Sequence, residues 1–237
     1  MTHTRTPYPI GTPGLAWGEA ERAQWLARQV RKRSYTSEVV ARINRLSARF
    51  AVAEYGQLNY SPDRYQLFSI RNRDWRDDKP LVLITGGVHG YETSGVHGAL
   101  EFLEQHAEAY ADRIDFLVTP CVSPWGYERI HRWNPHAIDP NRSFRENSPA
   151  EESGALMRLI APLRERVLVH IDLHETTDTN FVRPSPRGMA RPSNQAPYPT
   201  ASIWSPTAQT DSCRFRKPSS PRSRKSLTSP RRIRAAS

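Results

Sequence analysis

The 237-residue sequence contains little cysteine and no long hydrophobic run. Its two cysteines, Cys121 and Cys213, are too few for a disulfide framework or a cysteine-based zinc site. Cys121 lies in an apolar segment, where a small free thiol is usually buried. No segment is long and apolar enough to span a membrane, and the N-terminus lacks the apolar core of a signal peptide. We therefore expect a cytoplasmic protein without a membrane partner.

Acidic residues are nearly missing from residues 181–237. This segment holds 12 of the 34 Lys and Arg residues but only one of the 24 acidic residues, Asp211. Subtraction leaves 22 basic and 23 acidic residues in residues 1–180, so the net charge of +10 comes from the C-terminal segment. Because the segment is rich in Ser, Pro and Arg and has no apolar periodicity, we expect a disordered basic tail after one domain of residues 1–180.

Such a tail can bind nucleic acid or anionic surfaces through its Arg and Lys side chains. Aromatic residues for base stacking, such as Tyr198, Trp204 and Phe215, are few, so we expect no specific nucleic-acid partner. A different hypothesis is that the chain is truncated or out of frame after about residues 183–192. A GC-rich gene in the wrong frame yields the Arg, Pro, Ser and Ala found there.

Hydrophobic patterning predicts an α/β domain in residues 1–180. Apolar or alternating runs predict strands at 50–58, 65–71, 81–85, 114–122 and 167–173, the last three buried. Helical patterns occupy residues 17–33, 36–46, 92–109 and 151–163. Residues 123–147 are predicted to be one long loop, which in a compact domain usually has a function. We expect a mixed, mostly parallel central sheet with helices on both faces, incomplete at the C-terminus.

Three residues at strand ends have the chemistry of a zinc site. His89 and Glu92 follow the apolar strand 81–85 and lie three positions apart, so both can face one metal ion. His174 follows the apolar strand 167–173 and can supply a third ligand, because sites in open sheets form at the carboxyl ends of strands. Two histidines and one carboxylate leave a fourth zinc position open, as in catalytic sites. Zinc is inferred from the ligand types, and other divalent ions suit the same set.

Further segments extend this pattern into a resemblance. Ser123-Pro-Trp-Gly-Tyr127, then Arg132, Asp139-Pro-Asn141-Arg142 and the late His174 follow His89 and Glu92 in order. In this the chain resembles the zinc carboxypeptidases of the carboxypeptidase A type and their relatives, the succinylglutamate desuccinylases and aspartoacylases. Their pattern is His-x-x-Glu, Asn-Pro-x-Gly-Tyr, Arg, Asp-x-Asn-Arg and a later His. Ser123 stands in place of the family's Asn, and Trp125 in place of its Asp.

The resemblance implies roles for these residues. His89, Glu92 and His174 would bind one Zn²⁺ per chain. Asn141 and Arg142 would bind the substrate's carboxylate, for which a planar guanidinium is suited. Arg132 would stabilise the oxyanion, with Arg129 as the alternative. Asp139 would orient His89 on the metal.

The implied reaction is amide hydrolysis by a water molecule that the zinc activates, with a general base that moves the proton. In the family this base is a Glu well downstream of the third ligand, but no Glu occurs after Glu175. Glu175 itself adjoins His174 and is expected to point away from the metal. Glu151 and Glu152 are expected to complement the dipole of a helix. The general base therefore has no candidate in the sequence.

Three functions stay open at this point. The first is a zinc metallocarboxypeptidase that cleaves a C-terminal peptide bond, which Tyr127 favours. The second is a deacylase of N-acyl amino acids, favoured by the short spacing from Arg132 to Asn141 and by Asp172-Leu-His174. Both take a substrate with a free carboxylate. The third is a catalytically dead zinc-binding fragment or binding module, which the missing Glu favours, since general acid–base catalysis contributes roughly 10²–10⁴-fold.

Overall fold

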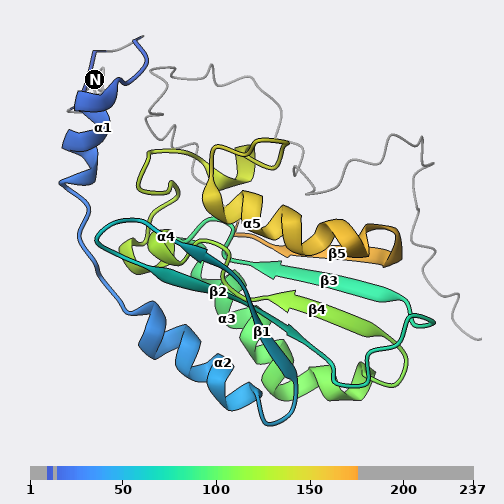
Figure 1. Cartoon of the computed structure of the whole chain (residues 1–237). Helices are drawn as coiled ribbons and strands as arrows, with labels where there is room; N and C mark the ends of the chain where they lie inside the picture. Colours follow the sequence, from blue (N-terminus) through green and yellow to red (C-terminus); the bar gives the residue numbers. More distant parts are fainter. Residues whose placement is uncertain (1–9, 13–14, 176–237) are drawn as a thin grey trace, which may run out of the picture. The chain divides into compact units, whose positions relative to one another are not determined.

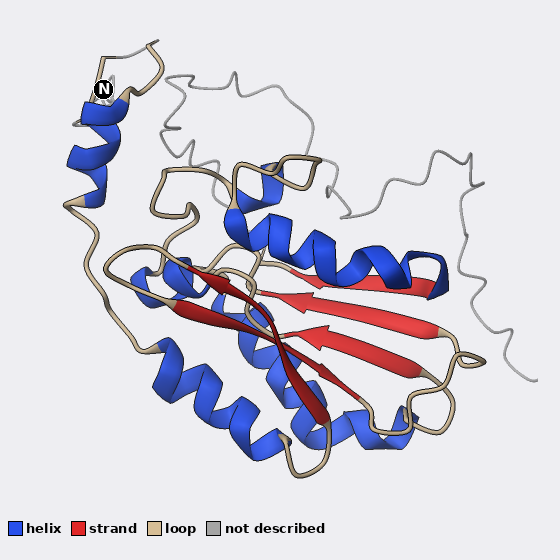
Figure 2. Ribbon diagram, viewed as in Figure 1, coloured by secondary structure: helices blue, strands red, loops and turns tan. Residues whose placement is uncertain are grey.

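The computed structural model describes residues 10–12 and 15–175 (Figure 1). They form a five-stranded mixed sheet with helices against both faces, which confirms the predicted fold class (Figure 2). The basic tail of residues 181–237, the hypothesis of a shifted frame and the incomplete C-terminus concern residues outside the described part. Within that part, no helix combines the length and apolar character that crossing a bilayer would require.

The sheet brings the ends of three neighbouring strands to one edge. Its strands are β1 (Ala51–Leu58), β2 (Tyr65–Arg71), β3 (Leu81–Gly86), β4 (Asp115–Thr119) and β5 (Val167–Leu173), in the order β1-β2-β4-β3-β5. The β1–β2 and β2–β4 pairs are antiparallel, whereas β3 runs parallel to both β4 and β5. Thr85 is opposite Thr119, and Gly86 is opposite Leu173. The loops that leave β3, β4 and β5 therefore start side by side.

Alternation along β3 produces two hydrophobic cores. Leu81 and Leu83 pack on one face of the sheet with Leu156 and Ile160 of α5 (Glu151–Ile160). Ile84 packs on the other face, where α3 (Thr93–Glu101) contributes apolar side chains. Successive side chains of a strand point to opposite faces, so a strand covered on both sides is apolar throughout. This explains why the run 81–85 could be recognised as a central strand.

The helices differ from the predicted ones mainly in their bounds. The helix predicted at 17–33 is only α1 (Glu19–Leu26). The one at 36–46 is a π-helical turn, η1 (Thr36–Val40), continued by α2 (Ala41–Leu46). The one at 92–109 is α3 followed by η2 (Phe102–His106) and η3 (Ala107–Tyr110). After α5, the chain continues through the 3-10 segment η5 (Ala161–Arg166).

The prediction of one long loop at residues 123–147 is wrong. A short helix, α4 (Pro124–Arg129), follows β4, and a 3-10 turn, η4 (Pro140–Arg142), lies further on. Pro124 suits the first turn of a helix because the missing N–H has no partner there. Ile130 adopts φ 54° and ends α4 in the left-handed region. The segment therefore contains two short helical pieces. They were not recognised in the sequence because they include residues that are typical of turns.

The prediction that β5 is buried is also wrong for the described part of the chain. Leu168, Val169 and Ile171 are 43–69% exposed, because β5 is the edge strand beside β3 and has no described neighbour on its other side. An apolar run does not distinguish a central strand from an edge strand. The two are distinguished only by whether the strand pairs with a neighbour on one side or on both.

Candidate metal centre

A sharp turn after β3 places the first two candidate ligands. Gly87 has φ +61°, and a Cβ there would lie 2.5 Å from Val96 of α3, so only glycine fits this position. His89 follows in the turn, and Glu92 is the residue that caps α3. The backbone N–H of Glu92 donates to the carbonyl of His89 at 3.1 Å, which closes the turn and brings both side chains to the same side.

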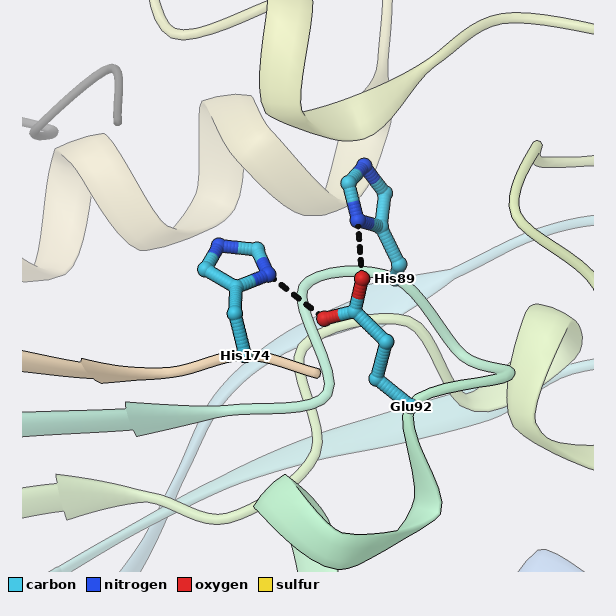
Figure 3. Close-up of side chains that lie close together, drawn as sticks. All are labelled: His89, Glu92 and His174. Carbon is cyan, nitrogen blue, oxygen red and sulfur yellow. Dashed lines mark hydrogen bonds and ion pairs between the residues drawn. The ribbon is translucent and has the colours of Figure 1, made fainter. Parts of the chain in front are cut away.

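The three candidate ligands meet at one point (Figure 3). One ligand atom from each of His89, Glu92 and His174 lies within 4.8 Å of the others. Nδ1 of His89 is 2.8 Å from one Glu92 carboxylate oxygen, and Nδ1 of His174 is 2.5 Å from the other. His89 and Glu92 are almost completely buried, and His174 is partly buried. The donor set and its convergence are consistent with a metal site, as in zinc carboxypeptidases.

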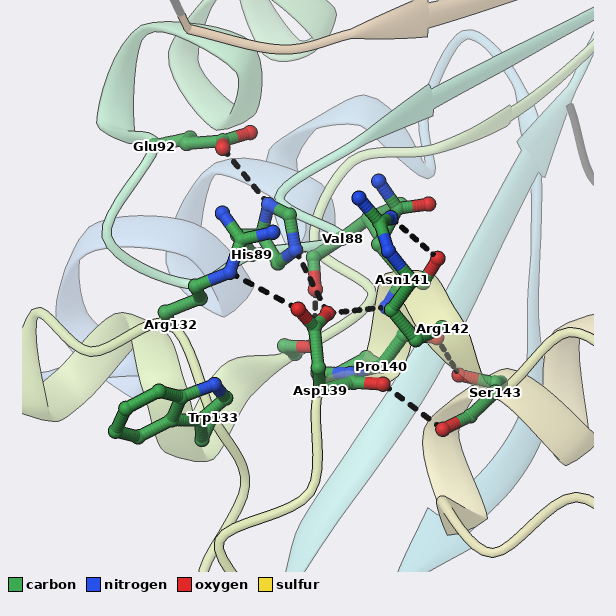
Figure 4. A network of polar contacts seen from close by, with 12 residues as sticks. Val88, His89, Glu92, Arg132, Trp133, Asp139, Pro140, Asn141, Arg142 and Ser143 are labelled. Carbon is green, nitrogen blue, oxygen red and sulfur yellow. Dashed lines mark hydrogen bonds and ion pairs between the residues drawn. The ribbon is translucent and has the colours of Figure 1, made fainter. Parts of the chain in front are cut away.

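The Nε2 atom of each histidine contacts an aspartate carboxylate. Nε2 of His89 is 2.9 Å from Oδ1 of Asp139 (Figure 4), and Nε2 of His174 is 2.6 Å from Oδ2 of Asp172. A carboxylate on one ring nitrogen fixes the tautomer and turns the other nitrogen toward the metal. In both rings it is Nδ1 that faces Glu92. The arrangement therefore fits a bound divalent cation.

The charges of the cluster support the same conclusion. Burial raises the pKa of Glu92, but hydrogen bonds with His174 and His89 outweigh it and lower this pKa to about 2. Burial lowers the pKa of His174, but Asp172 and Glu92 outweigh it and raise this pKa to about 10. A carboxylate thus stays ionised between two imidazoles. A divalent cation would take over the role of the imidazole proton, because histidine binds metals in its neutral form.

Asp139 joins the cluster to the substrate-binding candidates (Figure 4). Its Oδ1 also accepts from the backbone N–H of Asn141 at 2.9 Å, and its Oδ2 accepts from Nε of Arg132 at 3.0 Å. Arg132 reaches the hydroxyl of Tyr91 as well, and Tyr91 stacks on the His89 ring at a centroid distance of 5.9 Å. Asp139 thereby fixes His89 and Arg132 relative to each other.

The structure places Asn141 next to the cluster and Arg142 at its exposed border. Nδ2 of Asn141 is 3.5 Å from Nε2 of His174, and its buried Oδ1 has no hydrogen-bond partner among the described residues. Arg142 donates from NH1 to the carbonyl of Asn141 at 3.0 Å and is exposed to solvent. Arg129, the alternative to Arg132, is engaged elsewhere: it pairs with Asp63 at 2.6 Å and covers the Trp125 ring.

The glutamates weighed as general bases are also engaged elsewhere. Glu175 accepts from the backbone N–H of Ser94 at 2.8 Å, at the start of α3. Glu151 accepts from Asn59, while Glu152 is buried and bonds Tyr60 and Asn134, so its role is more than complementing a helix dipole. Among the described residues, none of the three faces the ligand atoms.

A match to a family model identifies the superfamily of the chain. The model of the succinylglutamate desuccinylase/aspartoacylase catalytic domain matches residues 78–195, which include all three candidate ligands. The chain belongs to the superfamily of zinc carboxypeptidases and succinylglutamate desuccinylases/aspartoacylases. This is the family that the order of motifs indicated.

Solved structures of candidate metallopeptidases are similar to part of the chain. A candidate metallopeptidase from Shewanella denitrificans is 27% identical with a TM-score of 0.51, and the match covers 62% of this chain and 53% of that one. Another from Shewanella amazonensis is 27% identical with a TM-score of 0.46, covering 55% and 50%. The chain thus spans about half the length of these relatives. A comparison with curated proteins finds no match.

Sequence reasoning missed two residues of this centre, Asp172 and Tyr91. Asp172 was noted only as part of the segment Asp172-Leu-His174. Its signal was its place two residues before His174, because side chains two apart lie on the same face of a strand. Tyr91 lies between the two ligands of the turn and gave no signal of its own.

Proposed function

We propose that the chain is a zinc-dependent hydrolase of the metallocarboxypeptidase type, acting on a C-terminal peptide bond. One observation carries the proposal. The two imidazole Nδ1 atoms and the Glu92 carboxylate converge, while Asp139 and Asp172 hold the other nitrogen of each ring. A purely structural cluster would not need both rings to be turned toward one shared carboxylate.

The chain's own residues can perform the remaining steps of binding and orientation. When bound, zinc polarises the scissile carbonyl and lowers the pKa of water. Arg132, fixed by Asp139 beside His89, is positioned to stabilise negative charge that develops on the carbonyl oxygen. Asn141 and the exposed Arg142 would bind the substrate's carboxylate and so select a chain end. The group that accepts the water proton is not among the described glutamates discussed above.

A second candidate is the deacylation of N-acyl amino acids. It is favoured by the family model, whose own description names a succinylglutamate desuccinylase/aspartoacylase domain. The metal ligands and the Asn141-Arg142 pair serve both reactions, because each substrate has an amide bond near a free carboxylate.

Metal content and two classes of substrate test the proposal. The purified chain should bind one zinc ion, and His89→Ala should abolish this binding. The zinc-loaded chain is then given an N-blocked dipeptide and, separately, N-succinylglutamate and N-acetylaspartate. Cleavage of the dipeptide supports the carboxypeptidase, and cleavage of the acyl amino acids supports the deacylase. A chain that binds zinc and cleaves neither is the catalytically dead zinc-binding form.

Arg142→Lys tests carboxylate binding in whichever reaction is found. A lysine retains the charge but loses the planar pair of donors, so we expect a raised KM. Arg145→Lys, in the same exposed segment, is the matched control and should leave KM unchanged. Equal KM changes in the two variants would contradict the role of Arg142.

A further inference from the structure

A single arginine far from the motifs clamps the turn that holds two of the ligands. Arg33 lies in the segment between α1 and η1 and is half-buried. Its Nε donates to the carbonyl of Tyr127 at 2.7 Å, and NH2 donates to the carbonyl of Gly90 at 3.0 Å. NH1 donates to Oγ1 of Thr93 at 2.8 Å. The guanidinium carbon also lies 3.5 Å from the centroid of the Tyr127 ring.

Two of these acceptors flank the candidate ligands in the sequence. Gly90 directly follows His89, and Thr93 directly follows Glu92, so Arg33 holds both ends of the turn between them. The third acceptor, Tyr127, is on α4. At this point the turn touches α4 backbone to backbone: a Cβ on Gly90 would lie 2.0 Å from the carbonyl carbon of Gly126. Arg33 thus joins the turn to α4 beside this backbone contact.

We propose that Arg33 is a positioning residue for the metal centre, fixing the His89–Glu92 turn through Gly90 and Thr93. This rests on the proposed metal site. Metal affinity depends on ligand atoms being held within about 0.5 Å of the productive geometry. The planar guanidinium meets three acceptors at once, and a lysine ammonium on its flexible stem cannot reproduce that geometry. Replacing Arg33 should therefore weaken zinc binding more than replacing another arginine that contributes equally to the stability of the fold.

Arg42 provides a matched control. Its guanidinium also joins separate elements, since it bonds both oxygens of Glu104 in η2 and Nδ1 of His97 in α3. His97 continues the contact to the hydroxyl of Tyr127, which donates to Glu38 of η1. These partners lie outside residues 87–93. Replacing Arg42 thus removes a comparable structural clamp without touching the ligand turn.

The test measures Zn²⁺ affinity by competition with a chromogenic chelator, together with the Tm of the metal-free protein. We expect Arg33→Lys to weaken Zn²⁺ binding by about 10-fold or more, the range typical of residues that orient metal ligands. Arg42→Lys should change it by less than about 2-fold at a similar loss of Tm. Thr93→Val, which removes one acceptor and leaves Arg33 in place, should weaken binding by an intermediate factor. With Co²⁺ as the probe, Arg33→Lys should also shift the visible absorption bands, which report ligand geometry.

The outcomes separate this inference from the proposed function. Unchanged Zn²⁺ affinity in Arg33→Lys and Thr93→Val, or equal weakening in Arg33→Lys and Arg42→Lys, would overturn the role of Arg33. A wild-type chain that binds Zn²⁺ but hydrolyses no substrate would overturn the proposed function and leave the Arg33 comparison intact. A wild-type chain that binds no Zn²⁺ would overturn both.

Discussion

The two aspartates behind the histidines should differ in how well they tolerate replacement by asparagine. Asp139 serves three donors: His89 and the Asn141 N–H on one oxygen, and Arg132 on the other. Asparagine has only one acceptor oxygen. In Asp139→Asn, one of its amide N–H groups must therefore face either the Arg132 donor or the His89 donor. The variant cannot satisfy all of its neighbours.

The surroundings of Asp172 should tolerate asparagine better. Its second oxygen accepts from the hydroxyl of Thr85 at 2.7 Å, and this hydroxyl also lies 3.0 Å from Nε2 of His170. Burial lowers the pKa of His170, which favours the neutral ring, and a neutral ring nitrogen can accept a hydrogen bond from the Thr85 hydroxyl. In Asp172→Asn, Thr85 can rotate, accept from the new amide and donate to His170, because a hydroxyl both donates and accepts. The hydrogen bonds around His174 can then be rebuilt.

We therefore expect Asp139→Asn to weaken Zn²⁺ binding by about 100-fold and Asp172→Asn by about 10-fold, within the range for residues behind metal ligands. Both variants lose one negative charge, so their ratio isolates the hydrogen-bond mismatch, about 1.4 kcal/mol. The assay is chelator competition at constant pH, with circular dichroism to confirm folding. Adding Thr85→Val to Asp172→Asn should remove the rebuilt contact and bring the loss close to that of Asp139→Asn. Asp172→Asn binding as weakly as Asp139→Asn without Thr85→Val would refute the reasoning.

Three other predictions concern the fold around the centre. Burial and Arg42 lower the pKa of His97 from 6.5, so its contribution to stability is present above pH 6.5 and is lost as pH falls through the lowered pKa. His97→Gln should flatten that decline, as measured by urea midpoints of the metal-free protein from about pH 7.5 to about pH 5. Gly90→Ala should destabilise the fold by about 3 kcal/mol or more, seen as a lower Tm, because its Cβ would overlap Gly126. Leu156→Ala, at a fully buried site, should cost about 2–5 kcal/mol in urea unfolding yet leave Zn²⁺ affinity within about 2-fold.

The sequence predicts the three candidate ligands because each of them follows a recognisable strand. His89 follows β3 and His174 follows β5, and both strands have apolar runs of the expected length. Their parallel pairing, with Gly86 opposite Leu173, then brings the two loops together. Local patterning was sufficient here because the sheet converts two strand ends into neighbours.

Contacts across long sequence distances were not predictable in the same way. Arg33 bonds Gly90 and Tyr127, 57 and 94 residues away, and nothing in its local sequence marks it. The exposure of β5 was missed for a related reason, since an apolar run is the same whether or not a neighbouring strand is present. Patterns report the local environment that a residue requires, whereas these features depend on which distant segment arrives beside it.

Because the centre depends on such distant contacts, residues outside the motifs contribute to it as well. The candidate ligands come from the loops after β3 and β5, whereas the residues proposed to orient them include Asp139 after β4 and Arg33 before β1. A segment holding only the motif residues from 81 to 174 would keep every candidate ligand but lose the clamp on the turn between His89 and Glu92. Since the free energy of metal binding includes the cost of ordering its ligands, such a segment should bind zinc more weakly than the whole chain. The residues before β1 are therefore part of the metal centre in the energetic sense, although none of them is proposed as a ligand.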